Sequence, residues 1–468
     1  MRTKLTPALA AVVFLVTLTA GCTETVSTPS VQTSRVGLAP TLGWSSWSFM
    51  RKDPTAAKIK AQAEAMVSSG LASLGYRYIN IDDYWYQCPR GEGPNVDRYG
   101  RWVTDAARFP SDGSTDGMEV VADYVHKLGL KFGIYVTPGI SKQAVARNTE
   151  VEGTPYHASD IATAARQDNY NCRGMYGIDY GKPGAQAYTD SWADMLASWG
   201  VDYVKLDGIT DDNVPDIQAW SAALAQTGRP IRLDITQGSF TITIAPTLQR
   251  YANQWVFAPD IECYRCEQGG SSYPLTSWAN VSSRFDWVAE CQPYGGPGGF
   301  NDYDSIEVGN GDNDGLTPDE RRTEMSLWAV GASPFILGVD LTNLDPFDLT
   351  LLKNADVLAV DQDSIDASRI VDTSTQQVFT KMEANGNAIV GLFSTGSKPA
   401  VVSTTASALG MPANSNGYLL DDLWLDRTTE TSGSISAKVP PHGVVLYRVE
   451  SLGGPTVATP STTLDPGS

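Results

Sequence analysis

Residues 78–85 read YINIDDYW, an apolar run that ends in two adjacent carboxylates, Asp82 and Asp83, with aromatic residues beside them. Adjacent anions repel each other, and burial raises the free-energy cost of each charge. A folded protein therefore tolerates such a pair only at a solvent-exposed strand end or where the two charges have a function. A single pair of this kind would be explained by a solvated junction between a strand and a loop. The same pattern recurs along the chain, and this recurrence favours a functional explanation.

Eight short apolar runs of this type lie between residues 41 and 340: TLGWSSW (41–47), YRYINIDD (76–83), KFGIYVTPG (131–139), VDYVKLDG (201–208), IRLDITQG (231–238), QWVFAPD (254–260), GGFNDYD (298–304) and PFILGVD (334–340). Stretches with apolar residues at helical spacing separate them. Strand–helix alternation in short units predicts parallel strands with right-handed crossovers. Eight such units predict a (β/α)8 TIM barrel rather than an open sheet.

Most of these runs are apolar at the start and end in polar or aromatic residues: Trp47, Asp82, Asp83, Tyr135, Lys205, Asp207, Asp234, Asp260, Asp302 and Asp304. In a parallel barrel all strand ends of one kind lie on one face, where the active sites of such enzymes are built. The sequence therefore predicts a ring of carboxylates and aromatic rings around a single mouth.

The barrel is predicted over residues 37–364, and a second domain follows it. Short alternating strands broken by Gly, Asn and Pro predict an antiparallel β-sandwich over residues 365–450. His442 precedes the last strand and is interpreted as a turn residue. Residues 451–468, rich in Pro, Thr, Ser and Gly, are predicted to form a disordered tail.

The N-terminus has the layout of a secretory signal over residues 1–22, with Arg2 and Lys4 before an apolar run. Small residues before Cys22 resemble a bacterial lipobox, in which this cysteine is lipidated. Thr19 stands where that pattern usually has an aliphatic residue, so plain cleavage is the alternative. Residues 23–36 are interpreted as a polar linker. An exported, extracellular or cell-surface protein, anchored to the membrane through Cys22, is expected.

Five further cysteines would meet an oxidising compartment. Cys263 and Cys266 in CYRC predict a local disulfide, with a redox or metal pair as the alternative. Which two of Cys88, Cys172 and Cys291 pair is left open by the sequence.

The formal net charge of −19 disfavours nucleic acid and anionic membrane surfaces as partners, since both are polyanions. A neutral oligo- or polysaccharide fits this charge. Glycoside hydrolysis also uses clustered carboxylates, because one attacks the anomeric carbon while another protonates the leaving oxygen. Few basic residues accompany the acids, so a structural ion-pair network explains them less well.

A metal site is the other use of clustered acids. NGDNDG (310–315) matches the opening of an EF-hand loop, but Arg321 stands where a bidentate Glu is required. The following TPDE (317–320) instead predicts a helix start with a capping box. No metal and no cofactor are expected.

Local context suggests roles for two acids. Asp207 follows a buried strand, and Lys205 lies two residues earlier on the same side, where it would keep a nucleophile ionised. Asp260 follows apolar residues, and desolvation would raise its pKa as a general acid requires. The reverse assignment stays open on these grounds.

Eight motifs, among them PTLGWSSW, GYRYINIDDYW, WGVDYVKLDG, NQWVFAPDI and GGPGGFNDYDSIEVGNG, resemble glycoside hydrolase family 27, the α-galactosidase (melibiase) family. The resemblance covers residues 38–364 and continues loosely into the sandwich. It implies a retaining mechanism with Asp207 as nucleophile and Asp260 as acid/base. It further implies that the terminal sugar is bound by Trp47, Asp82, Asp83, Tyr135, Lys205 and Asp304. Asp234, in the run IRLDITQG, is predicted as a further substrate-binding residue.

Several departures fall at the pocket. Val256 replaces an Arg that contacts the sugar in α-galactosidases, and Asp234 is the only acid in the stretch that replaces the family's Cys-Glu-Trp. The loop over residues 137–180 is long and can add subsites. Isomaltodextranase-like and β-L-arabinopyranosidase-like activities therefore remain alternatives to an α-galactosidase. A non-catalytic carbohydrate-binding surface lipoprotein is the alternative from another class.

Overall fold

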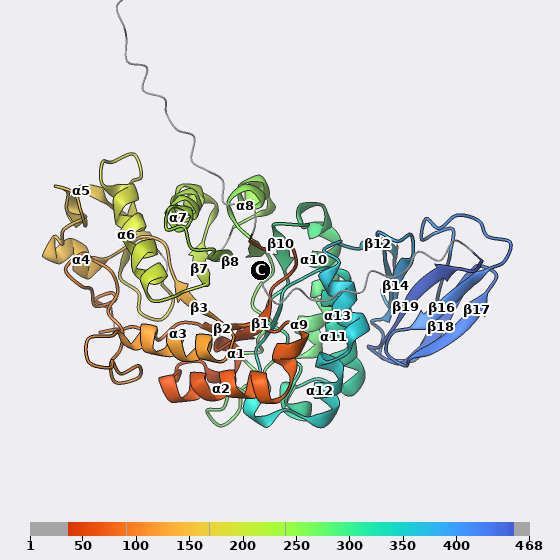
Figure 1. The fold of residues 1–468 in the computed structure, drawn as a ribbon. Helices are drawn as coiled ribbons and strands as arrows, with labels where there is room; N and C mark the ends of the chain where they lie inside the picture. The colour runs from red at the N-terminus through yellow and green to blue at the C-terminus, as the bar shows by residue number, and fades with distance from the viewer. Residues whose placement is uncertain (1–35, 90, 168, 239, 454–468) are drawn as a thin grey trace, which may run out of the picture. The chain divides into compact units, whose positions relative to one another are not determined.

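The computed structural model describes residues 36–89, 91–167, 169–238 and 240–453 (Figure 1). The predicted signal segment with Cys22, most of the linker and residues 454–468 of the tail lie outside the described residues. Within the described part, no helix is both long and apolar enough to cross a membrane.

Eight parallel strands form one sheet in the order β10-β9-β8-β7-β3-β2-β1-β11. Ile306, just beyond β10, bridges Leu337 of β11 in parallel and so links the two edges of the sheet. The predicted TIM barrel is confirmed. The strands are β1 (Leu42–Ser45), β2 (Tyr78–Ile81), β3 (Lys131–Val136), β7 (Tyr203–Ile209), β8 (Arg232–Gln237), β9 (Gln254–Val256), β10 (Phe300–Asp302) and β11 (Phe335–Leu337).

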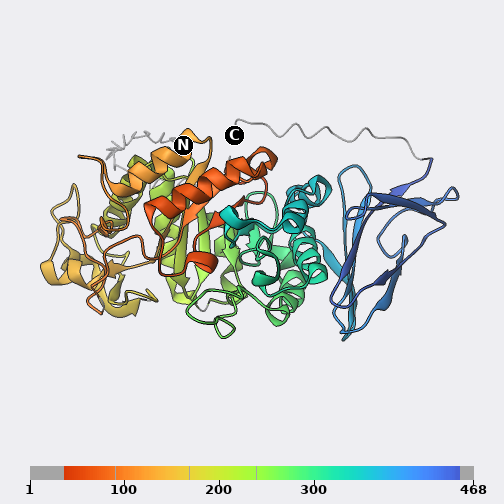
Figure 2. The same cartoon turned by 90° about the horizontal axis from the view of Figure 1, so that it is seen from below.

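Helices cover the outside of this sheet, as both views show (Figure 1, Figure 2). Parallel strands are thus buried on both faces, which is why they read as continuous apolar runs. The helices are α1 (Trp47–Met50), α2 (Ala56–Ser68), α3 (Gly117–Lys127), α6 (Ala185–Ser198), α7 (Val214–Gln226), α8 (Ala245–Tyr251), α9 (Trp278–Ser282), α10 (Arg284–Cys291), α11 (Pro318–Val330), α12 (Pro346–Leu352) and α13 (Ala355–Gln362).

The long loop between β3 and α6 forms a small three-stranded sheet of its own. It contains β4 (Ile140–Ser141), β5 (Ala162–Gln167) and β6 (Met175–Ile178), with α4 (Lys142–Arg147) and α5 (Ala158–Ile161). A disulfide joins Cys172 of this loop to Cys88, beyond β2, and Cys291 is free and buried. The predicted disulfide between Cys263 and Cys266 is also present.

The helix start predicted at TPDE is confirmed. Thr317 caps α11, Pro318 is its first residue, and the Glu320 side chain returns to the Thr317 backbone N–H in a capping box. Glu320 also contacts His442, whose φ of 55° marks the predicted turn.

The C-terminal strands, drawn in blue in Figure 2, form antiparallel sheets and confirm the predicted sandwich class. One sheet has the order β12-β13-β14-β19-β16-β17, and β15 pairs with β18. Their bounds are β12 (Ser368–Asp372), β13 (Gln376–Met382), β14 (Ala388–Ser394), β15 (Ala400–Thr405), β16 (Tyr418–Asp422), β17 (Arg427–Thr431), β18 (Ser434–Val439) and β19 (Val444–Ser451). The domain boundaries given above remain predictions.

Buried acids outside the pocket predict a pH-dependent stability. Burial raises the pKa of Glu324 to about 8, although the Glu307 N–H donates to its carboxylate at 2.9 Å. In the unfolded chain this group ionises near pH 4, so between about pH 4.5 and 8 the unfolded state binds fewer protons. Stability therefore falls as pH rises through this window. We expect a lower calorimetric unfolding temperature at pH 8.5 than at pH 5.

Glu324→Gln should flatten this dependence, because glutamine does not ionise. Glu430→Gln, on the exposed surface of β17, is the control and should leave the slope unchanged. An unaltered slope in Glu324→Gln would show that this carboxyl does not contribute.

Candidate active site

A pocket of about 760 Å³ opens where the strands end, and eight of the ten residues of the predicted ring line it. These are Trp47, Asp82, Asp83, Tyr135, Lys205, Asp207, Asp260 and Asp304. They come from β3, β7 and from segments just beyond the ends of other strands. Trp47 lies in the short helix α1 rather than at a strand end, because β1 stops at Ser45.

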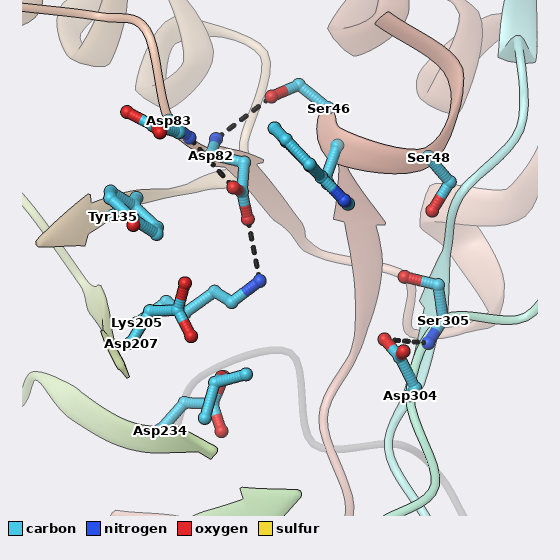
Figure 3. A network of polar contacts seen from close by, with 12 residues as sticks. Ser46, Ser48, Asp82, Asp83, Tyr135, Lys205, Asp207, Asp234, Asp304 and Ser305 are labelled. Carbon is cyan, nitrogen blue, oxygen red and sulfur yellow. Dashed lines mark hydrogen bonds and ion pairs between the residues drawn. The ribbon is translucent and has the colours of Figure 1, made fainter. Parts of the chain in front are cut away.

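The pair Asp82–Asp83 is almost fully buried, and polar contacts compensate both charges. Lys205 Nζ donates to Asp82 Oδ2 at 2.8 Å, and the Asp83 N–H donates to Asp82 Oδ1 at 2.8 Å (Figure 3). Asn171 Nδ2 donates to Asp83 Oδ2 at 2.6 Å. Burial still raises the pKa of Asp83. The fold thus holds two hydrogen-bond acceptors at the pocket wall.

Asp207 lies deep in the pocket, and burial raises its pKa to about 8. Lys205 opposes this shift, and the Gly208 N–H donates to Asp207 Oδ1 at 2.8 Å. Lys205 was expected to keep Asp207 ionised, and it does lower the pKa of Asp207, but burial has the larger and opposite effect. The physical reason is that Lys205 makes its direct ion pair with Asp82, while desolvation acts on Asp207 in full.

Asp260 is exposed at the rim, which contradicts the apolar environment expected for it. The preceding Phe257 and Ala258 are buried, but the chain reaches the surface at Pro259. Asp260 Oδ2 accepts a hydrogen bond of 2.6 Å from the Tyr264 hydroxyl. Asp207 and Asp260 therefore occupy the floor and the mouth of one pocket.

Asp304 and Tyr135 complete the wall. Asp304 has a left-handed φ of 79°, and its two carboxylate oxygens accept the Ile261 and Ser305 N–H groups, each at 2.7 Å. Burial raises the pKa of Asp304 and of Tyr135. The Tyr135 hydroxyl is buried without a hydrogen-bond partner in the described part of the chain, so it is available to a ligand.

Asp234 lies one layer deeper than predicted. Strand β8 continues to Gln237, so Asp234 is not at its end but pairs in register with Lys205. It lines a cavity of about 30 Å³ that Val256 also lines, and it accepts the Tyr203 hydroxyl at 2.8 Å. Figure 3 shows Asp234 below Lys205 and Asp207.

Among the lining residues that escaped the sequence analysis are Tyr170, Asn171, Glu262 and Tyr264. The first two belong to the loop between β3 and α6, and the other two follow Asp260. Cysteines within or beside these segments, Cys172 and the CYRC motif, were the available signal.

Asp260, Glu262 and Asp304 place ligand atoms within 4.8 Å of one another, as a metal site could. Arg51 lies 3.6 Å from Glu262, and the Asp304 oxygens already accept two N–H groups. These partners supply the positive charge and the hydrogen bonds that a cation would otherwise provide, and we assign no metal here.

Comparison with known proteins agrees with this architecture. A family model described as alpha galactosidase A matches residues 39–162 and 168–363, and one described as alpha galactosidase C-terminal beta sandwich domain matches residues 373–449. An α-galactosidase of Cyamopsis tetragonoloba is 30% identical over 422 residues, covering 88% of this chain and 86% of the relative.

Two solved structures are also similar. A β-L-arabinopyranosidase of family 27 from Geobacillus stearothermophilus gives a TM-score of 0.80 at 30% identity, covering 89% of this chain and 97% of that one. The α-galactosidase I of Mortierella vinacea gives 0.68 at 26% identity, covering 89% and 98%. Fold, site and relatives define a glycoside hydrolase. The chain belongs to glycoside hydrolase family 27 and is α-galactosidase-like.

Proposed function

We propose that the protein is a retaining exo-glycosidase that removes a terminal α-linked sugar, with α-galactoside specificity. The observation that supports it is the depth of the two acids in one pocket, with Asp207 buried at the floor and Asp260 exposed at the mouth. A sugar that enters such a pocket points its leaving group outward. The proton donor for the glycosidic oxygen therefore belongs at the mouth, and the nucleophile belongs below.

In this mechanism Asp207 attacks the anomeric carbon while Asp260 protonates the leaving oxygen. Asp260 then acts as base and activates the water that releases the sugar. Lys205 and the Gly208 N–H stabilise the Asp207 carboxylate during attack. Trp47, Asp82, Asp83, Tyr135 and Asp304 are proposed to hold the sugar, because carboxylates accept hydrogen bonds from its hydroxyls and aromatic rings pack on its apolar face.

β-L-Arabinopyranosidase activity is a second candidate. Its support is the similar solved enzyme with that activity, together with Val256 at the place of an expected Arg. Isomaltodextranase-like activity is a further alternative, because Val256 departs from the α-galactosidase pattern.

A panel of 4-nitrophenyl α-D-galactopyranoside, 4-nitrophenyl β-L-arabinopyranoside and isomaltosyl oligosaccharides tests the specificity. We expect the α-galactoside to give the highest kcat/KM, with retained anomeric configuration by NMR. A higher kcat/KM on either other substrate would replace the proposed specificity. Binding of sugar without hydrolysis of any substrate would favour the non-catalytic alternative.

We further propose that residues 1–22 direct export and that Cys22 carries a lipid anchor. Two disulfides support an oxidising compartment. Mass spectrometry of the protein from its host should find a mature chain that begins at an acylated Cys22, and an unmodified Cys22 would contradict the anchor.

A further inference from the structure

The loop after Asp260 is fixed close to the mouth of the pocket. Cys263 and Cys266 close its first turn, and the Cys263 N–H donates to the Leu275 carbonyl at 2.8 Å. Glu267 accepts from Arg51 Nε at 3.0 Å, and Ser272 Oγ donates to the Phe49 carbonyl at 2.8 Å. The loop is thereby tied to the segment around α1.

Tyr264 lies between the two cysteines, and its hydroxyl has a defined hydrogen-bond direction. Trp47 Nε1 donates to the Tyr264 hydroxyl at 2.8 Å, and an indole nitrogen is a donor only. The Tyr264 proton is therefore free for Asp260 Oδ2, 2.6 Å away. Because Oδ2 accepts this bond, a protonated Asp260 carries its own proton on Oδ1.

The Tyr264 hydroxyl keeps this proton at neutral pH. Burial, followed by the charges of Glu262 and Asp260, raises the pKa of Tyr264 above its ordinary value. When Asp260 gives up its proton, the same hydrogen bond stabilises the carboxylate that forms.

Tyr264 is also 42% exposed and lines the pocket. The Arg51 guanidinium lies 4.8 Å from the ring centroid, and Glu267 and Glu262 hold that guanidinium in turn. A fixed aromatic ring thus stands beside the proposed proton donor, where the group attached to the glycosidic oxygen must lie.

We propose that Tyr264, on the loop closed by Cys263 and Cys266, forms the subsite for the leaving sugar and positions the proton of Asp260. The ligand class is a neutral pyranose linked to the terminal sugar. This inference rests on the proposed function, since it takes Asp260 as the acid. It predicts that an oligosaccharide, rather than a small aglycone, is the natural substrate.

The kinetic test compares Tyr264→Phe and Tyr264→Ala on melibiose and on 4-nitrophenyl α-D-galactopyranoside, whose leaving group needs little protonation. Tyr264→Phe should lower kcat on melibiose about tenfold with KM little changed, as loss of one charge-assisted hydrogen bond does. Tyr264→Ala should in addition raise KM for melibiose. The kcat/KM of both variants on the nitrophenyl substrate, which reports only the steps up to the glycosyl-enzyme, should fall much less than that on melibiose, because nitrophenolate leaves without an acid.

Tyr124→Phe, on α3 and outside the pocket lining, is the matched control and should behave as the wild type. Equal losses on both substrates, or unchanged melibiose kinetics in Tyr264→Ala, would overturn the subsite.

Calorimetric binding separates this inference from the proposed reaction. In the Asp207→Asn background melibiose should bind more tightly than galactose, and adding Tyr264→Ala should remove the difference. If this Tyr264-dependent binding is found but the wild-type protein hydrolyses none of the substrates, the subsite is kept and the reaction is rejected. An active enzyme that binds melibiose no better than galactose would keep the reaction and reject the subsite.

Discussion

Asp207→Gly should lower kcat by at least about 10⁴-fold on every substrate, because no other group can form the covalent intermediate. Added azide should restore product formation, since it fits the space of the lost carboxylate. The product should be the glycosyl azide of inverted configuration, as azide attacks the sugar directly. NMR of the product gives the anomer.

Failure of azide to rescue a folded Asp207→Gly would show that the nucleophile is misassigned. Asp234→Asn is the comparison, because Asp234 lies beneath the pocket and off its wall. That variant should keep the covalent step and show no azide effect.

Asp260→Gly should lower kcat about 10²- to 10⁴-fold on substrates with a sugar leaving group, the range for loss of a general acid. For 4-nitrophenyl glycosides the rate of forming the glycosyl-enzyme should fall less, because nitrophenolate leaves without an acid. Azide should here give the glycosyl azide of retained configuration, because it attacks the intermediate already bound to Asp207.

The two azide products thus distinguish the two roles. An inverted azide from Asp260→Gly would exchange the assignments, which the local sequence context left open. The experiment is informative because burial raises the pKa of Asp207, and a buried carboxyl with a raised pKa would also suit the general acid.

The barrel and most of the pocket were predictable from the sequence because burial on both faces makes each strand a continuous apolar run. Polar residues just beyond the runs, such as Asp82, Asp83 and Asp260, then mark one face of the barrel. The order of the strands follows from their order in the chain.

The remaining features depend on tertiary contacts that local sequence does not contain. Asn171 reaches Asp83 from 88 residues away, and the loop that carries it has no periodic pattern. The environment of Asp207 depends on which carboxylate Lys205 contacts, and the exposure of Asp260 depends on where the chain reaches the surface, at Pro259. Asp234 was expected at the end of its strand, but β8 continues for three residues beyond it.

The link between Cys88 and Cys172 has a practical consequence for anyone producing this enzyme. It closes a span of 84 residues and lies next to Asn171, which touches Asp83. By chain entropy, a link of this length is worth about 4 to 5 kcal/mol. Recombinant protein made in a reducing cytoplasm would lack this disulfide, and the loop that carries Asn171 would be held less firmly. Its measured activity would then be lower than that of the disulfide-bonded enzyme. Periplasmic or secreted expression is the appropriate source of material for every assay proposed above.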